Sequence, residues 1–446
     1  YDHQQKCVNE VRQQIKNGSK SVLLQAATGG GKCLGRDTLV LLYNGKTKKV
    51  QDVVPGDKLM GHDSCPRTVE SVCSGRENLY KIKPKKGEPW VCNESHILSL
   101  KRTNATESRG CAGYETRSKP KGHLQNVSVK DYLNKSNSFK HKYKQWRTGV
   151  DFSNARKRFN LSPYFIGLWL GDGTSRNSSI TSEDQECVAS YYEEAHKHNL
   201  FVRKEKSNSS ANLYISTKLM RSKDDNPMTT GLRKLNLLQN KHIPHCYLTA
   251  TRENRLELLA GLIDSDGSLG NGTYDFISKF ERLSDDIIYL SRSLGLAAYK
   301  TECTKSHDKG KTNGTYYRVS ISGEISIVPC RIKRKIAADR RQKKDVLVTG
   351  FDIEKMGVGD YYGFEISGND RLFMLGDFTV THNTIMAGDF VKGAVKKGNK
   401  VWFTVPRKQL LLQMANTFDE FDIDYGVIAA GHKADYNKQV QICSMQ

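Results

Sequence analysis

The sequence predicts a multidomain chain in which an α/β nucleotide-binding sheet is interrupted by a long insert, all-β at its two ends and α+β in its centre. Three observations support this fold class. A phosphate-binding motif breaks off after Lys32 and resumes at Thr384. Short strands separated by turn residues fill residues 33–100 and return over 341–383. Between these two stretches, an apolar helix that ends in Asp-Gly occurs twice.

Composition and charge favour nucleic acid as a partner. The 446 residues are 37% hydrophobic, which is enough for two or three cores. With 70 Lys and Arg against 48 Asp and Glu, the net charge is +22 at pH 7, a field that attracts phosphate, although solvated lysine faces would also produce it. The 11 cysteines show no zinc-type spacing, and no signal peptide or membrane-length apolar run occurs. We therefore expect an intracellular protein with reduced cysteines and no membrane partner.

The outer segments, residues 1–32 and 384–446, alternate helix and strand, with a strand expected at Lys400–Val405. The stretch before Cys33 has the form of a phosphate-binding loop, but Cys33 stands where a Ser or Thr hydroxyl is needed for Mg²⁺. Removing residues 33–383 restores the loop. An ordinary glycine-rich turn between strand and helix is the alternative. The restored loop would bind ATP phosphates and Mg²⁺ through Gly29, Gly30, Gly31, Lys32 and Thr384.

In this loop and in Val405–Leu411, the outer segments resemble the first lobe of superfamily 2 helicases of the DEAD/DEAH type. The resemblance implies a host protein that binds nucleic acid and uses ATP, with an α/β parallel sheet. The acidic motif and the second lobe of that family do not occur in the sequence. Because the chain also starts at Tyr1 and stops at Gln446 in mid-pattern, we expect a helicase fragment that cannot hydrolyse ATP by itself.

Three short motifs lie at the ends of the insert: Cys33–Val40, Cys92–His96 and Val380–Thr384. On these motifs, residues 33–383 resemble an intein, and the insert as a whole is similar to the bifunctional inteins of fungal vacuolar ATPases. The resemblance implies a horseshoe-like, all-β Hint splicing domain. The two halves of this domain are expected at residues 33–150 and 341–383.

The residues at the first junction can start splicing without a cofactor. The Cys33 thiol can attack the Lys32 carbonyl if an acid protonates the departing nitrogen. We expect His96 to be that acid, and Asn93 either to donate to the oxyanion or to hold the bond in a reactive shape. Each residue also has an ordinary explanation: a buried cysteine, or a hydrogen-bonded strand histidine.

At the second junction, the Thr384 hydroxyl would take the acyl group as a branched ester. Asn383 then attacks its own carbonyl through its side-chain amide and cuts the Asn383–Thr384 bond, while His382 protonates the leaving group. A simple turn at residues 382–383 is the alternative. Two positions depart from the family pattern, so help to asparagine cyclisation is expected to differ: Arg371, where many relatives have histidine, and Gly363, where some have aspartate.

The repeated helices, Tyr164–Gly173 and Leu258–Gly267, predict a metal site. Small residues at four-residue spacing in each copy (Gly167 and Gly171; Gly261 and Ser265) would let the helices touch. Their terminal carboxylates, Asp172 and Asp266, would then lie side by side, and such a pair suits Mg²⁺. A helix C-terminal turn is the alternative for one Asp-Gly, but two copies argue against it.

These repeats resemble the LAGLIDADG homing endonucleases, which implies an α+β domain over residues 151–340 with pseudo-twofold αββαββα symmetry, acting as a monomer on double-stranded DNA. Asp264 has Leu170 as its counterpart and cannot belong to the symmetric pair. The resemblance also implies two catalytic lysines, Lys241 and, in an uncertain register within Arg331–Lys335, Lys333. A plain phosphate contact is the alternative for both.

Residues 101–150 are basic and include Lys140–Arg147, where cations and aromatics mix, so this stretch either grips DNA or is a solvated linker. Together the patterns predict splicing that joins Lys32 to Thr384 and releases a site-specific, Mg²⁺-dependent endonuclease for the uninterrupted host gene. Two alternatives stay open: a splicing insert whose endonuclease only binds DNA, and an active helicase ATPase with a passive insert.

Overall fold

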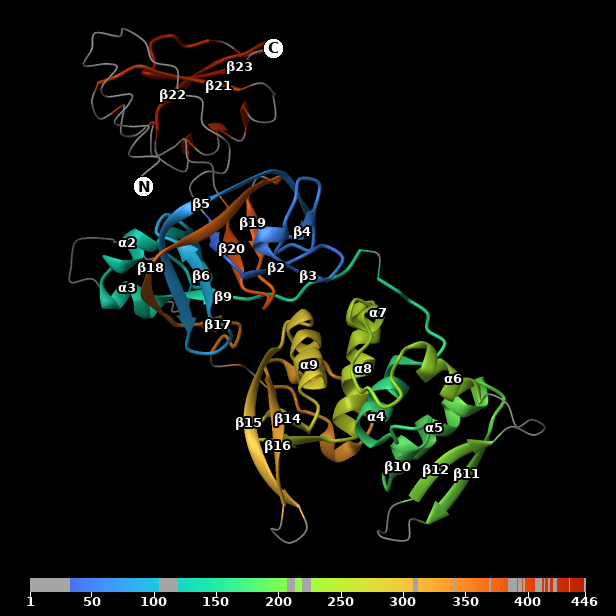
Figure 1. Ribbon diagram of the computed structural model, residues 1–446. Helices are drawn as coiled ribbons and strands as arrows, with labels where there is room; N and C mark the ends of the chain where they lie inside the picture. Colours follow the sequence, from blue (N-terminus) through green and yellow to red (C-terminus); the bar gives the residue numbers. More distant parts are fainter. Residues whose placement is uncertain are drawn as a thin grey trace.

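The computed structural model describes most of the insert and parts of the segment that follows it (Figure 1). The predicted ATP-binding residues Gly29, Gly30, Gly31, Lys32 and Thr384 lie outside the described residues, so the loop stays a prediction. The described residues are 33–103, 119–153, 155–206, 213–218, 226–307, 312–340, 342, 344–368, 370–383 and, with gaps, 391–444.

A β-rich domain is built from both ends of the insert. Its longest element is an antiparallel pair, β5 from the first end and β18 from the second, which curves across the domain in Figure 1. One sheet has the order β18-β1-β6-β5-β4 and the other the order β17-β9-β7-β20-β19, with β8 on β7. The elements are β1 (Leu34–Gly35), β2 (Leu39–Leu41), β3 (Thr47–Lys49), η1 (Val50–Asp52), β4 (Lys58–Met60), β5 (Pro66–Pro84), β6 (Trp90–Asn93), β7 (Ile97–Arg102), β8 (Leu124–Ser128), α2 (Val129–Leu133), α3 (Asn137–Lys142), β9 (Tyr143–Trp146), β17 (Val348–Thr349), β18 (Phe351–Ile366), β19 (Leu372–Met374) and β20 (Val380–His382).

Strand β5 is longer than its sequence pattern suggests, because Ser74–Asn78 reads as a turn between two short strands. The strand continues through this stretch since Gly75 leaves room for the Tyr361 ring: a Cβ on Gly75 would lie 2.5 Å from the Tyr361 hydroxyl oxygen. The basic stretch is not a linker either. Strands β8 and β9 pair with β7, so the part of residues 101–150 that the structure describes belongs to the domain.

The central domain consists of two α+β units related by the sequence repeat. The first unit has a three-stranded sheet in the order β10-β12-β11, and the second a four-stranded sheet in the order β13-β14-β16-β15. The first unit departs from the expected pattern, since a single bridge between Gly173 and Ile180 stands where the second unit has β13. The elements are α4 (Pro163–Asp172), β10 (Ile180–Ser182), α5 (Gln185–Lys197), β11 (Phe201–Lys206), β12 (Leu213–Lys218), α6 (Pro227–Lys234), α7 (His245–Leu248), α8 (Arg252–Asp264), β13 (Gly267–Gly270), β14 (Thr273–Ser278), α9 (Glu281–Ser293), β15 (Ala297–His307), β16 (Thr312–Ser322), η3 (Ile325–Ile327) and η4 (Lys333–Lys335).

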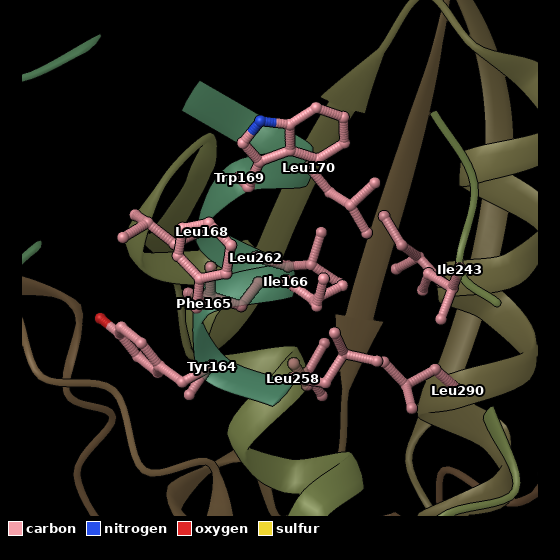
Figure 2. Close-up of a cluster of buried hydrophobic side chains, with 14 of the residues drawn as sticks. Tyr164, Phe165, Ile166, Leu168, Trp169, Leu170, Ile243, Leu258, Leu262 and Leu290 are labelled. Carbon is pink, nitrogen blue, oxygen red and sulfur yellow. The ribbon is translucent and has the colours of Figure 1, made fainter. Parts of the chain in front are cut away.

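Helices α4 and α8 form the centre of this domain. Each begins at a hydroxyl cap, Ser162 for α4 and Thr251 for α8, whose side chain accepts a bond from a backbone N–H in the first turn. Their apolar residues belong to one core that spans both units. Figure 2 shows Leu258 of α8 beside Leu290 of α9 within this core.

The predicted close contact of the two helices is confirmed. A Cβ on Gly167 would lie 2.2 Å from the Leu258 carbonyl oxygen, and one on Gly261 would lie 2.2 Å from the Tyr164 carbonyl oxygen. A Cβ on Gly171 would lie 2.1 Å from Ser265 Oγ. Each helix therefore packs against the backbone of the other where small residues occur.

We expect Gly261→Ala to destabilise the protein by about 1–3 kcal/mol, because the methyl group would meet backbone that cannot move without separating the helices. Urea unfolding followed by circular dichroism measures this change. Gly270→Ala is the matched control, since a Cβ there would have no atom within 4 Å. Equal midpoints for the two variants would contradict the close helix contact.

The two domains of the insert are joined by polar and apolar contacts. Arg147 Nη2 lies 2.6 Å from Asp377 Oδ2, in the turn between β19 and β20, and Arg147 Nη1 donates to Tyr299 Oη in β15 at 3.4 Å. Tyr289 Oη in α9 donates to the Gly45 carbonyl at 2.6 Å. Tyr289 also packs edge-on against Phe378 of the β19–β20 turn, with ring centroids 5.0 Å apart, so the central domain contacts the hairpin that leads to the second junction.

After the insert, three parallel strands follow in the order β21-β23-β22: β21 (Val401–Val405), β22 (Tyr425–Ile428) and β23 (Val440–Ser444). The strand predicted at Lys400–Val405 is therefore confirmed, with parallel pairing as expected of an α/β sheet. In the part of the chain that the structure describes, no helix has the length and apolar character needed to cross a membrane.

Candidate splicing and endonuclease sites

The first junction residue, Cys33, is buried, with 1% of its surface exposed. Its backbone N–H, the nitrogen of the Lys32–Cys33 bond, donates to Asn93 Oδ1 at 3.1 Å, and the Asn93 N–H donates to the Cys33 carbonyl at 3.1 Å. Asn93 Nδ2 donates to Glu77 Oε2 at 2.8 Å, which fixes the orientation of the amide because a carboxylate can only accept. Of the two roles considered for Asn93, this geometry fits holding the bond.

His96 connects the first junction to the second. The imidazole is buried, and its Nε2 lies 2.6 Å from Oγ1 of Thr381, the residue before His382. The ring also packs edge-on against Trp90, with centroids 5.4 Å apart. Through its backbone, His96 donates to the Asn93 carbonyl at 3.2 Å. The structure thus brings three of the predicted splicing residues into one buried region.

The second junction lies at the end of β20. His382 pairs with Leu372 of β19 and Ile97 of β7 and is buried. The Asn383 N–H donates to the Arg371 carbonyl at 2.9 Å, and Asn383 Nδ2 donates to the Phe364 carbonyl. Arg371, the first departure from the family pattern, is buried with φ of 50° and shapes the turn before β19.

Strand β18 brings the two junctions together. Leu34, next to Cys33, pairs with Tyr362, and two residues further along β18 the Phe364 carbonyl accepts the bond from the Asn383 side chain. Leu34 and Asn383, which lie at opposite ends of the insert in sequence, therefore both contact one short segment of β18. This proximity is what transfer of an acyl group from one junction to the other requires.

The endonuclease carboxylates lie at the ends of the paired helices. Asp172 is the last residue of α4, whereas Asp266 lies in the turn two residues beyond the end of α8 and is exposed. Burial, and next the neighbouring Asp266 carboxylate, raise the pKa of Asp172 to about 7, although Lys335 and Lys241 lower it. A charge at Asp172 is therefore costly unless a cation offsets it.

Two buried lysines cap these helices in equivalent ways. Lys241 Nζ donates to the carbonyls of Leu170 at 2.9 Å and Gly171 at 3.0 Å. Burial lowers the pKa of Lys241 to about 8, although the carboxylates of Asp266 and Asp172 raise it. Lys335 Nζ donates to the corresponding carbonyls of α8, at distances of 2.9, 2.8 and 2.8 Å from Ile263, Asp264 and Ser265.

The structure places Lys335, and not the predicted Lys333, at the end of α8, while the catalytic role of the second lysine stays a prediction. Lys333 begins the 3₁₀ turn η4 and is exposed, whereas Lys335 ends that turn, is buried, and occupies the position equivalent to Lys241. Burial lowers the pKa of Lys335, while Asp264 opposes this shift. A 3₁₀ turn places neighbouring side chains about 120° apart, so spacing along the chain could not settle the register.

Asp264 is a structural carboxylate, as its unmatched counterpart Leu170 suggested. It is 1% exposed and accepts bonds from Tyr164 Oη at 2.8 Å and from the backbone N–H of Arg331 at 2.6 Å. Burial raises the pKa of Asp264, although these donors lower it. By anchoring residue 331, Asp264 holds the segment that carries Lys335.

Asp172→Asn and Asp264→Asn are expected to change stability in opposite directions in metal-free protein. The pKa of Asp172 is about 7 in the folded protein and near 4 in the unfolded chain, so the charged side chain lowers stability as the pH rises from 4 to 7. Asp172→Asn removes this charge and should raise the free energy of unfolding by on the order of 2 kcal/mol at pH 8. Asp264→Asn should lose about 1–3 kcal/mol, since an amide NH₂ would face donors. Thermal unfolding in EDTA at pH 4 and pH 8 measures both. No gain for Asp172→Asn at pH 8 would contradict the proposed desolvation.

The carboxylate pair fits a hard divalent cation. Asp172 and Asp266 could supply oxygen ligands, and a bound cation would offset both the burial and the repulsion by Asp266 that raise the pKa of Asp172. No group of three or more His, Cys, Asp or Glu side chains that could hold a metal occurs among the described residues. Such a cation would take its other ligands from water and substrate.

Sequence reasoning missed residues whose role depends on a neighbouring strand. Leu79 of β5 pairs with Asn93 of β6, and Glu77 lies two residues before Leu79. Because side chains alternate along a strand, Glu77 and Asn93 point to the same face of the sheet. Thr381 also contacts His96 through a neighbouring strand, because β20 pairs with β7, which begins directly after His96. A pairing of β5 with β6 would have been needed to find Glu77, and nothing local indicates that pairing.

Two protein-family models match the chain. Residues 33–163 match the homing-endonuclease-associated Hint family, which makes the β-rich domain an intein-type splicing domain by class. Residues 242–344 match the homing endonuclease family. The chain therefore has one region that matches Hint domains and one region that matches homing endonucleases, the two parts that a bifunctional intein combines.

Curated relatives are distant. The chain is 26% identical to the replicative DNA helicase DnaB of Mycobacterium intracellulare over 83% of this chain and 62% of the relative. It is 22% identical to the homothallic switching endonuclease of Saccharomyces cerevisiae over 84% of each. It is 20% identical to the catalytic subunit of the V-type proton ATPase of Candida tropicalis over 92% of this chain, which spans half of that relative.

Solved structures are similar in parts. The endonuclease I-DmoI, crystallised with DNA and Mn, covers 36% of this chain and 89% of its own, with 14% identity and a TM-score of 0.26. The gp41-1 intein covers 22% of this chain and 81% of its own, with 20% identity and a TM-score of 0.14. The family assignment rests on the two family matches.

Proposed function

We propose that the chain excises residues 33–383 and joins Lys32 to Thr384 by autocatalytic splicing. The observation that carries this proposal is the meeting of both junctions on β18, where Leu34 pairs with Tyr362 and Asn383 bonds to Phe364. Two bonds that must react in sequence lie close together in a buried region. The chemistry needs side chains alone, without ATP.

At the first junction, the Cys33 thiol attacks the Lys32 carbonyl and forms a thioester. The hydrogen bond from the Cys33 N–H to Asn93, itself held by Glu77, fixes the scissile amide before attack. His96 is the acid for the departing nitrogen, and such an acid contributes about 10²–10⁴-fold in rate.

At the second junction, Thr384 takes the acyl group and Asn383 cyclises. The bond from Asn383 Nδ2 to the Phe364 carbonyl orients the attacking nitrogen and increases its electron density. His382, buried beside it in β20, protonates the leaving amine. The ester then rearranges to a peptide bond.

The excised insert is proposed to be a monomeric, site-specific endonuclease for double-stranded DNA. Asp172 and Asp266 would hold Mg²⁺, which supplies activation of water and stabilisation of the leaving oxygen when bound. Lys241 and Lys335 place positive charge at the helix ends, where it offsets the carboxylates and the helix dipoles. The basic surface would follow the DNA backbone.

For the host, we propose an intracellular helicase whose ATP-binding loop is complete once Lys32 and Thr384 are joined.

Expression of the full chain followed by denaturing mass analysis tests splicing: the ligated product of residues 1–32 and 384–446 and the free insert are expected. Retention of the full mass would support a passive insert instead. Incubation of the purified insert with the uninterrupted host gene and Mg²⁺ tests cleavage, and binding without cleavage would indicate a decayed endonuclease.

A further inference from the structure

A second cysteine lies beside the splicing nucleophile. Cys33 belongs to a small buried cluster with Leu79 and Tyr361, and Cys73 of β5 packs against that cluster. The Cys33 and Cys73 thiols are close enough to hydrogen bond, and this bond is the largest influence on the pKa of Cys73, which it lowers. Cys73 is half-buried, because it packs against the cluster that contains Cys33.

Strand register explains the approach of the two thiols. Cys73 pairs with Gly363 of β18 on one side, and Leu34 pairs with Tyr362 on the other. Continuing that antiparallel register by one residue brings Cys33 level with Gly363. Because Gly363 has no side chain, β18 itself places no side chain between the two cysteines at this register. The glycine that departs from the family pattern thus makes room for Cys73.

The surroundings favour a thiolate at Cys73. The backbone N–H of Gly363 also lowers the pKa of Cys73, in opposition to burial. Cys92, on the neighbouring strand β6, has no such donor effect, and burial raises its pKa well above the usual value. A thiol with a lowered pKa in contact with a second thiol is an arrangement suited to proton transfer.

We infer that Cys73 is the base that removes the thiol proton of Cys33 when splicing starts. This inference rests on the proposed splicing function. In the step, the Cys33 S–H proton moves to Cys73 Sγ, and Cys33 Sγ forms a bond to the Lys32 carbonyl carbon. The Lys32–Cys33 C–N bond breaks, and its nitrogen takes a proton from His96. Cys73 gains one proton, from Cys33, while His96 gives one proton to the nitrogen, so charge and protons balance and no oxidant or other reagent is consumed.

The other titratable groups around the thiol pair are less suited to this role. Glu77 of β5 is engaged by Asn93 Nδ2 from β6. Burial, and next the two thiols and Glu77, raise the pKa of Tyr361 from β18, so this hydroxyl stays protonated at neutral pH. The rate of thioester formation should therefore rise with pH through the lowered pKa of Cys73.

The test isolates the first step in the full chain carrying Asn383→Ala and Thr384→Ala. Hydroxylamine releases residues 1–32 from any thioester, and mass analysis over time gives the rate. Cys73→Ala is expected to slow this release by about 10²-fold and to move its rise to higher pH. Cys73→Asp, which restores a proton acceptor, should recover most of the rate. Cys65→Ala, at an exposed cysteine just before β5, is the matched control and should match the parent.

C-terminal cleavage in a Cys33→Ala background separates a chemical effect from misfolding. Cyclisation of Asn383 needs the same fold but not the thiol pair, so Cys73→Ala should leave it unchanged. Release from Cys73→Ala at the parent rate, with an unchanged pH profile, would overturn the inference and leave splicing standing. Loss of both cleavages would show a structural role and would also overturn it. No release from the parent itself would overturn the proposed splicing function.

Discussion

Cys33→Ala and Asn383→Ala are each expected to remove the ligated host product, a loss of at least about 10³-fold, because each deletes the group that forms or breaks a backbone bond. The two variants should fail differently. Without the thiol, Asn383 can still cyclise, so Cys33→Ala should yield residues 1–383 and 384–446. With the thiol but without the asparagine, Asn383→Ala should release residues 1–32 on addition of hydroxylamine. Denaturing mass analysis separates these fragments.

The control for these variants is Cys65→Ala, which removes an exposed thiol and should splice like the unmodified chain. Asn383→Ala also loses the bond to the Phe364 carbonyl, so its fold should be compared by thermal unfolding. A ligated product from either variant would disprove the assigned chemistry. Thr384→Ser, in contrast, keeps the hydroxyl and should retain ligation.

Lys335→Met is expected to lower DNA cleavage at saturating DNA by about 10³-fold, whereas Lys333→Met should leave the rate within about twofold. The physical reason is position. Lys335 is buried against three carbonyls at the end of α8, beside the carboxylates, whereas Lys333 is exposed on the same turn. Single-turnover cleavage of the host gene in Mg²⁺ measures the rate without the influence of product release.

Binding measurements distinguish the two roles considered for these lysines. If Lys335 is only a phosphate contact, Lys335→Met should weaken binding and reduce the salt slope by about one, with cleavage of bound DNA unchanged. If its charge supports the carboxylate site, binding should change little while cleavage falls. Thermal unfolding controls for the lost helix cap. An equal loss for Lys333→Met would restore the original register.

Local pattern predicted much of this molecule. The apolar helices with Gly167 and Gly261 predicted close helix packing, and the structure places each glycine against the backbone of the other helix. The strand at Lys400–Val405 also formed as predicted. These succeed because period and side-chain size act within one short segment. Strand β5, in contrast, runs without a break through Ser74–Asn78, since pairing with β18 overrides the local preference for a turn there.

The sequence by itself determined that the central helices repeat, and it predicted where the insert begins and ends, because these are properties of residues adjacent in the chain. The tertiary structure alone decided that Lys335 rather than Lys333 caps α8, that Glu77 orients Asn93, and that Cys73 faces Cys33. These contacts join strands and turns that are distant in sequence. Their register is set by cooperative pairing and burial across the whole domain, which no local spacing encodes.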